Sequence, residues 1–315
     1  MKHSRHAPSI VTRGLTKEFG ERRAVNAVDL TVNRGEVFGF VGLNGAGKTT
    51  FMRMLVGLVR PTAGTFSVLG TSDLGSGVMR RVGTMIEGPA FHPSMTGRQN
   101  LRYIARFVGV GDSEVDRALN EVDLILRADS KYRTYSLGMK QRLGIACALL
   151  GNPELLILDE PANGLDPSGI ASMRELLRNQ AEQGRTVFLS SHLLAEISQI
   201  CDRVGVLHEG SLVAVGTPEE IENSDAEASA LTLTCDQQEV AARIVQGLAG
   251  VAGVRVVPDG LEIDVPSSHT ASVVSALVSS GIAVTSVGRR DHTLEDAFLS
   301  MTAGAARGSH TSEVG

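Results

Sequence analysis

A glycine-rich segment, Gly42-Leu43-Asn44-Gly45-Ala46-Gly47-Lys48-Thr49, matches the pattern of a phosphate-binding loop. Its glycines allow backbone N–H groups to turn inward toward phosphate oxygens, and the positive end of a following helix would point to the same place. Lys48 would add a charge beside the β- and γ-phosphates, and the Thr49 hydroxyl suits Mg²⁺. A string of this kind arises by chance in on the order of one chain in a hundred of this length. We therefore predict nucleotide binding through Gly42, Asn44, Gly45, Ala46, Gly47, Lys48, Thr49 and Thr50.

A second chemical candidate is the pair of carboxylates, Asp159 and Glu160, that follows the apolar run Leu155–Leu158. If the run is a buried parallel strand, Asp159 emerges at its carboxyl end, where such sheets bind ligands. Asp159 could then hold Mg²⁺ directly or through water. Glu160 is placed to act as the general base toward a water that attacks the γ-phosphate. An apolar strand with an acidic end is common, so this interpretation depends on the phosphate loop.

The elements needed to position these residues follow from hydrophobic periodicity. A buried strand, Glu36–Val41, precedes the loop, and apolar residues from Phe51 to Val59 recur at helical spacing after it. Residues 98–150 are mostly helical in pattern, and Ser113 with Asp116 predicts a capped helix start. The alternation of strands and helices predicts an α/β fold with a mostly parallel sheet. The other predicted elements are strands Ile10–Leu15, Val25–Val32, Thr65–Leu69, Val187–Ser190, Val204–Leu207 and Leu212–Val215, helix Ser168–Gln183 and a short helix from Leu193.

The order of elements changes beyond residue 218, which predicts a second domain. Residues 218–228 read as a short helix followed by a linker, and residues 229–302 then give the pattern β-α-β-β-α-β. This is the split pattern of a small ferredoxin-like α+β domain. Its hairpin turns at Pro258-Asp259-Gly260, and a last helix is expected at Leu294–Met301. We thus divide the chain into domains 1–222 and 229–302 and a flexible tail, 303–315.

Composition excludes several classes of protein. The chain has 30 basic and 35 acidic residues among 315, so a bulk electrostatic interaction with nucleic acid is not expected. Its three cysteines, Cys147, Cys201 and Cys235, show neither zinc-site spacing nor a disulfide framework. No run approaches the ~18 apolar residues of a membrane helix, and the basic N-terminus lacks the apolar stretch of a secretory signal. Action at a membrane would therefore require a partner.

Over residues 8–220 the chain resembles the ATPase subunit of an ABC transporter, because further motifs occur in that family's order. Residues 135–142, with Ser136 and Gly138, resemble the signature loop, and residues 163–166, ending in Asp166, resemble the D-loop. His192 resembles the switch histidine, and Phe19 resembles the aromatic residue that stacks on adenine. Each of these residues alone would more readily be a cap, a structural histidine or a packing residue, but their ordered co-occurrence favours the family.

This resemblance implies a P-loop ATPase domain with a helical subdomain at about 98–150, with ATP and Mg²⁺ as cofactors. Glu160, His192 and Lys48 would be the catalytic residues. Two copies would face each other head to tail around two ATP molecules, so that Ser136 and Gly138 of one copy contact the γ-phosphate held by the other. A separate integral-membrane permease would hold the homodimer at the inner face of the cell membrane, in the cytoplasm.

Two departures from the family pattern stand out. Glu87 occupies the position of the usual Q-loop glutamine, where it could still offer oxygen to Mg²⁺ beside the nucleotide. The glutamate resembles the branch that protects cells against bacitracin and lantibiotic peptides, although it could also be a neutral replacement. Leu137 and Met139 replace small or polar signature residues. Residues 91–101 resemble the segment that docks the membrane partner, with an internal core role equally open, and residues 294–299 resemble the end of drug-exporting ATPase subunits.

The leading prediction is therefore the motor subunit of an exporter of antibiotics, drugs or peptides. A soluble ATPase acting on ribosomes or DNA is the first alternative. Two features count against it: the chain has one phosphate loop, and the 87 residues between Lys48 and Ser136 contain no heptad repeat of a long coiled coil. A phosphotransferase would not need the signature, D-loop and switch histidine together. An importer subunit is not excluded by the ATPase half, since only the C-terminal domain argues for export.

Overall fold

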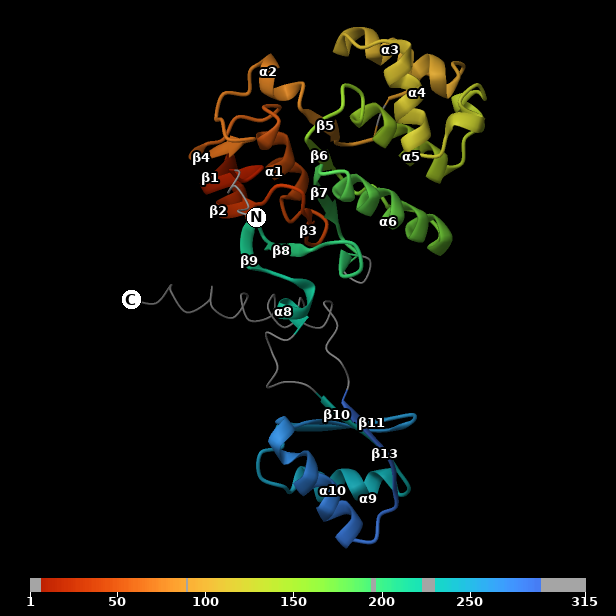
Figure 1. Ribbon diagram of the computed structural model, residues 1–315. Coiled ribbons are helices and arrows are strands. Elements are labelled where there is room, and N and C mark those ends of the chain that lie inside the picture. Colours follow the sequence, from red (N-terminus) through yellow and green to blue (C-terminus); the bar gives the residue numbers. More distant parts are fainter. Residues whose placement is uncertain (1–6, 89, 194–196, 223–229, 290–315) are drawn as a thin grey trace, which may run out of the picture. The chain divides into compact units, whose positions relative to one another are not determined.

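The computed structural model describes residues 7–88, 90–193, 197–222 and 230–289. The chain divides into two compact units, Met1–Pro218 and Glu219–Gly315. Figure 1 shows the helices and strands of each unit. The predicted helix at 294–301, the tail, and residues 194–196 of the helix predicted from Leu193 lie outside the described residues.

The first unit is built on a six-stranded sheet in the order β5-β6-β7-β3-β8-β9. The first five strands in this order are parallel, and β9 pairs antiparallel with β8. The predicted mostly parallel sheet is therefore confirmed, and all five residues of its central strand β3 are buried. The strands are β3 (Val37–Val41), β5 (Val82–Met85), β6 (Leu155–Leu158), β7 (Thr186–Ser191), β8 (Arg203–His208) and β9 (Ser211–Gly216).

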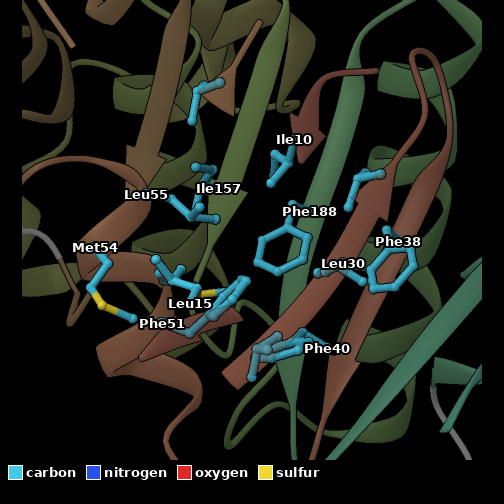
Figure 2. Packing of buried hydrophobic residues seen from close by; sticks show 14 of the residues in the cluster. Ile10, Leu15, Leu30, Phe38, Phe40, Phe51, Met54, Leu55, Ile157 and Phe188 are labelled. Atoms are coloured by element: carbon cyan, nitrogen blue, oxygen red, sulfur yellow. The ribbon is translucent and has the colours of Figure 1, made fainter. Parts of the chain in front are cut away.

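The N-terminal strands form a separate antiparallel sheet in the order β2-β1-β4, an arrangement that hydrophobic periodicity did not predict. Its strands are β1 (Ile10–Phe19), β2 (Arg22–Val32) and β4 (Ala63–Val68). Residues of both sheets and of helix α1 (Lys48–Leu55) share one hydrophobic core (Figure 2). Phe51 of α1 packs on Phe40 of β3, with ring centroids 4.7 Å apart. Because burying such a side chain contributes about 1.5–3 kcal/mol, this packing fixes the helix that carries Lys48 and Thr49.

Helices fill the region between β5 and β6, as predicted. They are α3 (Gly97–Val108), α4 (Asp112–Glu121) and α5 (Leu137–Ala148), with 3₁₀ turns at Ile125–Arg127 and Tyr132–Thr134. A short helix, α2 (Ser76–Met79), precedes β5, and α6 (Pro167–Glu182) lies between β6 and β7. Thr96 begins α3 with a reciprocal capping box to Gln99. Neither α2 nor β5, each four residues long, was predicted.

Two predicted helix boundaries are wrong. The start of α4 is capped by Gly111 and not by Ser113, which lies inside the helix, while Asp116 forms an ion pair with Arg98 instead of closing a capping box. Helix α1 ends at Leu55, because Gly57 takes a left-handed conformation (φ 76°) and turns the chain out of the helix. Leu58, expected on its buried face, is 70% exposed.

The second unit contains a four-stranded antiparallel sheet in the order β11-β12-β10-β13, with its own hydrophobic core. Its elements follow one another as β-α-β-β-α-β; the assignment to the ferredoxin-like class and the exact domain boundaries stay predictions. The elements are α8 (Pro218–Glu222), β10 (Ala230–Cys235), α9 (Gln238–Gln246), β11 (Gly253–Val257), β12 (Gly260–Asp264), a 3₁₀ turn at Ser267–His269, α10 (Thr270–Ser279) and β13 (Val284–Arg289).

Candidate functional site

The glycine-rich loop joins the buried strand β3 to helix α1, as the sequence predicts. Gly45 and Gly47 have φ angles of 84° and 109°, which an L-residue with a side chain rarely adopts. A Cβ atom at Gly47 would lie 2.2 Å from the carbonyl oxygen of Ala24, so this position accepts only glycine. Gly47 is the N-cap of α1 and offers no side-chain cap, so the first N–H groups of the helix are available to an anion.

Lys48 begins α1, and its side chain folds back over the loop. It is 6% exposed, and its Nζ donates a hydrogen bond of 2.6 Å to the carbonyl oxygen of Gly42. The same ammonium lies 3.3 Å from Oε1 of Glu160. Nζ of Lys48 also donates a longer hydrogen bond of 3.4 Å to the carbonyl oxygen of Leu43. The three N–H donors thus all have partners, and a phosphate oxygen would replace one of them.

Thr49 and Asp159 lie together although 110 positions separate them in sequence. The Thr49 hydroxyl donates to Oδ2 of Asp159 at 2.8 Å. A hydroxyl oxygen and a carboxylate oxygen are the ligands that Mg²⁺ prefers, so the donor set fits this ion. In the described residues there is no group of three or more His, Cys, Asp and Glu side chains that could hold a metal, so phosphate and water oxygens would complete the coordination.

Glu160 follows Asp159 at the carboxyl end of β6 and connects two of the predicted catalytic residues. Its Oε2 lies 2.7 Å from Nδ1 of His192, which immediately follows β7. An ionised carboxylate only accepts hydrogen bonds, so His192 donates through Nδ1. Glu160 itself has a left-handed backbone (φ 51°), an uncommon conformation for a residue with a side chain. The side chains of Lys48, Glu160 and His192 thus contact one another in series at the carboxyl ends of the inner strands.

A cavity of about 460 Å³ opens over the loop and is bounded by Glu160 on the side of the sheet. Phe19 is 52% exposed at this cavity, with Nζ of Lys17 lying 4.8 Å from the centre of its ring. An exposed aromatic ring is suited to stack on a nucleotide base. The lining residues are Phe19, Arg22, Ala24, Leu43, Asn44, Gly45, Ala46, Gly47, Lys48, Thr49, Thr50 and Glu160.

Seven predicted site residues do not line this cavity. Three of them, Gly42, Asp159 and His192, contact residues that do, and the other four do not. Glu87 forms an ion pair with Arg53 of α1. Ser136 is the N-cap of α5 and accepts a hydrogen bond from Met139, and Asp166 is the N-cap of α6. Gly138 lies in the first turn of α5, beside the side chain of Leu165. Their contacts to nucleotide therefore stay predictions.

Sequence reasoning missed two residues at the site. Ser190, which is fully buried, hydrogen-bonds Asp159 and Glu160, and Arg22 lines the cavity beside the loop. A polar residue at the end of the apolar run of β7 was the available signal for Ser190. Arg22 carried no signal, because it is one of two adjacent exposed arginines at the start of β2.

Comparison with known proteins agrees with this geometry. Residues 25–163 match the family model described as "ABC transporter". The chain is 38% identical over 299 residues to the bacitracin transport ATP-binding protein BcrA of Enterococcus faecalis, covering 94% of this chain and 96% of that protein. It is 38% identical over 201 residues to the lantibiotic transport ATP-binding protein SrtF of Streptococcus pyogenes, covering 64% of this chain and 87% of that protein.

A solved structure titled as the ATP-binding subunit of an ABC transporter has a TM-score of 0.60 and 32% identity, covering 68% of this chain and 92% of that one. The similarity in fold covers 68% of this chain and agrees with the similarity in sequence. Hydrogen bonds and an ion pair connect Lys48 and Thr49 of the phosphate loop to Asp159, Glu160 and His192 beside one cavity. Sequence and geometry therefore agree on the relationship. The chain belongs to the ABC transporter family, as an ATPase subunit that couples the hydrolysis of ATP to transport.

Proposed function

We propose that this chain is the motor subunit of an exporter, in which two copies close around two ATP molecules and hydrolysis opens them again. The observation that carries the proposal is the connected set of side chains Lys48, Glu160 and His192, of which Lys48 and Glu160 line the cavity. Such a set can bind a terminal phosphate and activate a water in the same place.

The chemistry follows from the partners that these side chains have in the structure. Lys48 would exchange its hydrogen bond to Gly42 and its contact with Glu160 for oxygens of the phosphates. Glu160, relieved of the ammonium, would accept a proton from the attacking water while His192 holds its other oxygen. Thr49 and Asp159 are the residues that would hold Mg²⁺, and Glu87 is a further predicted ligand. The ion supplies positive charge that balances the phosphates when it is bound.

Closure of two copies would complete each site. Ser136 and Gly138 do not line the cavity of their own chain, but they stand at the N-terminus of α5, a 12-residue helix whose first N–H groups can receive an anion. Placed against the ATP of a second copy, this helix start would add hydrogen bonds to the γ-phosphate. Loss of that phosphate would remove those bonds, and ATP would thereby bias a two-state dimer.

A separate membrane protein would carry the cargo. The structure has, among its described residues, no helix of the length and apolarity required to span a membrane. A cavity of about 570 Å³ lies beside α3 and is lined in part by Phe91, Pro93, Met95 and Tyr103. The proposal places the permease against this cavity, because Tyr103 is 56% exposed there and the lining is largely apolar.

An antibiotic peptide is the cargo that the relatives favour, since the bacitracin and lantibiotic transport proteins are 38% identical to this chain. The test is to express the chain in a susceptible host together with a polytopic membrane protein, chosen from the genes that neighbour its own. We expect raised resistance to bacitracin or a lantibiotic, lost in the matched Lys48→Ala strain. Unchanged resistance with active ATPase, or increased uptake of the peptide, would contradict the proposed export.

A further inference from the structure

A single buried hydroxyl connects the two acidic residues of the ATP site. Ser190 belongs to β7, which pairs in parallel with β6, and Leu189 lies opposite Leu158. The register therefore brings Ser190 beside Asp159, although 31 positions separate the two residues. Its side chain is fully buried, so neither of its hydrogen bonds competes with bulk water.

The directions of both hydrogen bonds are fixed by chemistry. The Ser190 hydroxyl lies 2.5 Å from Oδ1 of Asp159, and an ionised carboxylate only accepts, so the hydroxyl proton points to Asp159. The backbone N–H of Glu160 lies 2.9 Å from the same Oγ and can only donate to it. One hydroxyl thus donates to one residue and accepts from the next.

The bond to Asp159 decides which of its oxygens is left for the nucleotide. With Oδ1 held by Ser190, Oδ2 faces the hydroxyl of Thr49 at 2.8 Å. The N–H of Asp159 donates to the carbonyl oxygen of Met85 at 2.7 Å. Two hydrogen bonds therefore hold the carboxylate of Asp159 in one orientation, and a third holds its backbone. A carboxylate held in this way can meet an incoming cation without reorganising.

The bond to Glu160 acts on the backbone. Glu160 has φ 51°, a conformation that persists only when its surroundings determine it. The N–H at that residue is held by Ser190, and the side chain that leaves the same Cα lies between Lys48 and His192. The orientation of the general base therefore depends on a hydroxyl that does not touch the substrate.

We propose that Ser190 is a positioning residue for ATP hydrolysis, which directs Oδ2 of Asp159 to the Mg²⁺ site and holds Glu160 in its left-handed conformation. The inference rests on the proposed roles of Asp159 and Glu160. It assigns no contact between Ser190 and nucleotide. Loss of the hydroxyl should consequently affect turnover and the requirement for Mg²⁺ more than it affects the binding of ATP itself.

The test compares Ser190→Ala and Ser190→Thr in the full chain, with Ser191→Ala as the matched control. Ser191 is the next residue of β7, is also buried, and its hydroxyl accepts a hydrogen bond from Leu193 instead of contacting the carboxylates. The readouts are kcat and KM for ATP, the Mg²⁺ concentration that gives half-maximal activity, binding of a fluorescent ATP analogue in EDTA, and thermal unfolding.

We expect Ser190→Ala to lower kcat by about 10- to 100-fold and to raise the Mg²⁺ requirement by a similar factor, as for partners that orient metal ligands. Binding of the analogue in EDTA should stay near that of the wild type, Ser190→Thr should recover much of kcat, and Ser191→Ala should retain it. If Ser190→Ala does not fold, Ser190→Cys, with a weaker donor, should show an intermediate kcat and Mg²⁺ requirement.

Wild-type kcat and Mg²⁺ dependence in the folded alanine or cysteine variant would overturn the proposal. So would an equal loss in Ser190→Ala and Ser191→Ala that follows only their melting temperatures, because a merely structural role produces that result. Failure of the proposed Mg²⁺ site can be distinguished from failure of the role given to Ser190. In the first case the wild-type protein itself would hydrolyse ATP without Mg²⁺.

Discussion

Glu87 and Arg53 form an ion pair that joins the segment after β5 to the last turn of α1. Glu87 has a left-handed backbone (φ 58°), and its side chain is 66% exposed. Because α1 also carries Lys48 and Thr49, this pair links the phosphate-binding helix to the chain that leads into the helical region. The charge that Glu87 adds relative to a glutamine is therefore balanced by Arg53.

Glu87→Gln should keep ATPase activity within about fivefold of the wild type, since an exposed ion pair contributes about 0–1 kcal/mol. Arg53→Gln is the matched variant, because it removes the other half of the pair without touching the Q-loop position. The measurement is steady-state ATPase activity with the free energy of unfolding in urea. Loss of activity in Glu87→Gln alone would mean that the carboxylate performs a step that an amide cannot.

Much of the ATP site follows from local sequence, because its geometry is set within short segments. The glycine-rich segment from Gly42 follows strand β3 and leads into helix α1, as its pattern predicts. Asp159 directly follows the apolar strand β6, as its position predicts. Ser190 could not be assigned a role, because its contacts depend on the pairing of β6 with β7, and sequence does not give that register.

Other parts of the fold could not be predicted from local sequence patterns, because they also depend on contacts between distant residues. The antiparallel sheet of β1, β2 and β4 depends on pairing between distant strands. The start of α4 was misplaced because Asp116, read as part of a cap, is used by Arg98 from a neighbouring helix. An ion pair with another helix competes with local capping for the same side chain. The sequence around Ser113 does not show which side chains form such pairs.

Lys48→Ala should weaken ATP binding by about 10- to 100-fold, because hydrogen bonds to charged groups contribute about 1.5–3 kcal/mol. Turnover should fall at least as far, since the ammonium also faces Glu160 at 3.3 Å. Isothermal titration with ATP and a phosphate-release assay measure the two effects. Lys131→Ala, which removes an exposed lysine away from the cavity, is the charge-matched control. Equal affinities in the two variants would contradict the assignment of the loop.

Phe19→Ala should weaken ATP binding by about 5- to 100-fold, because stacking of a base on an aromatic side chain contributes about 1–3 kcal/mol. Phe19→Trp should retain binding, since it keeps an aromatic face at the cavity. The free energy of unfolding should change little, because the ring is 52% exposed. Titration with ATP and with inorganic triphosphate separates the base from the phosphates: an equal loss for both ligands would argue against stacking.

Low pH should reduce the free energy of unfolding of the ATPase unit, in part through Glu154. Hydrogen bonds from Arg81, and then from Arg34, lower the pKa of Glu154 to about 2 from 4.5. The ionised group thus stabilises the fold fully above pH 4.5, and this contribution is lost as the pH falls toward about 2. Because the side chain is 41% exposed, we expect a contribution no larger than about 1 kcal/mol.

Glu154→Gln should consequently be less stable than the wild type at pH 7, and the difference should narrow between pH 5 and pH 3. Urea unfolding at several pH values measures it, with Glu182→Gln, an exposed carboxylate of α6, as the matched control. A difference that stays constant with pH would contradict the role given to the Arg81–Glu154 pair.

Light scattering coupled to size exclusion tests the nucleotide-dependent pairing of two chains most directly. Glu160→Gln removes the general base but leaves Lys48, Thr49 and Asp159 in place, so ATP should bind without being hydrolysed. The account predicts a dimer with ATP and a monomer with ADP, and a monomer under both conditions once Lys48→Ala is added. A Glu160→Gln protein that binds ATP yet remains a monomer would contradict it.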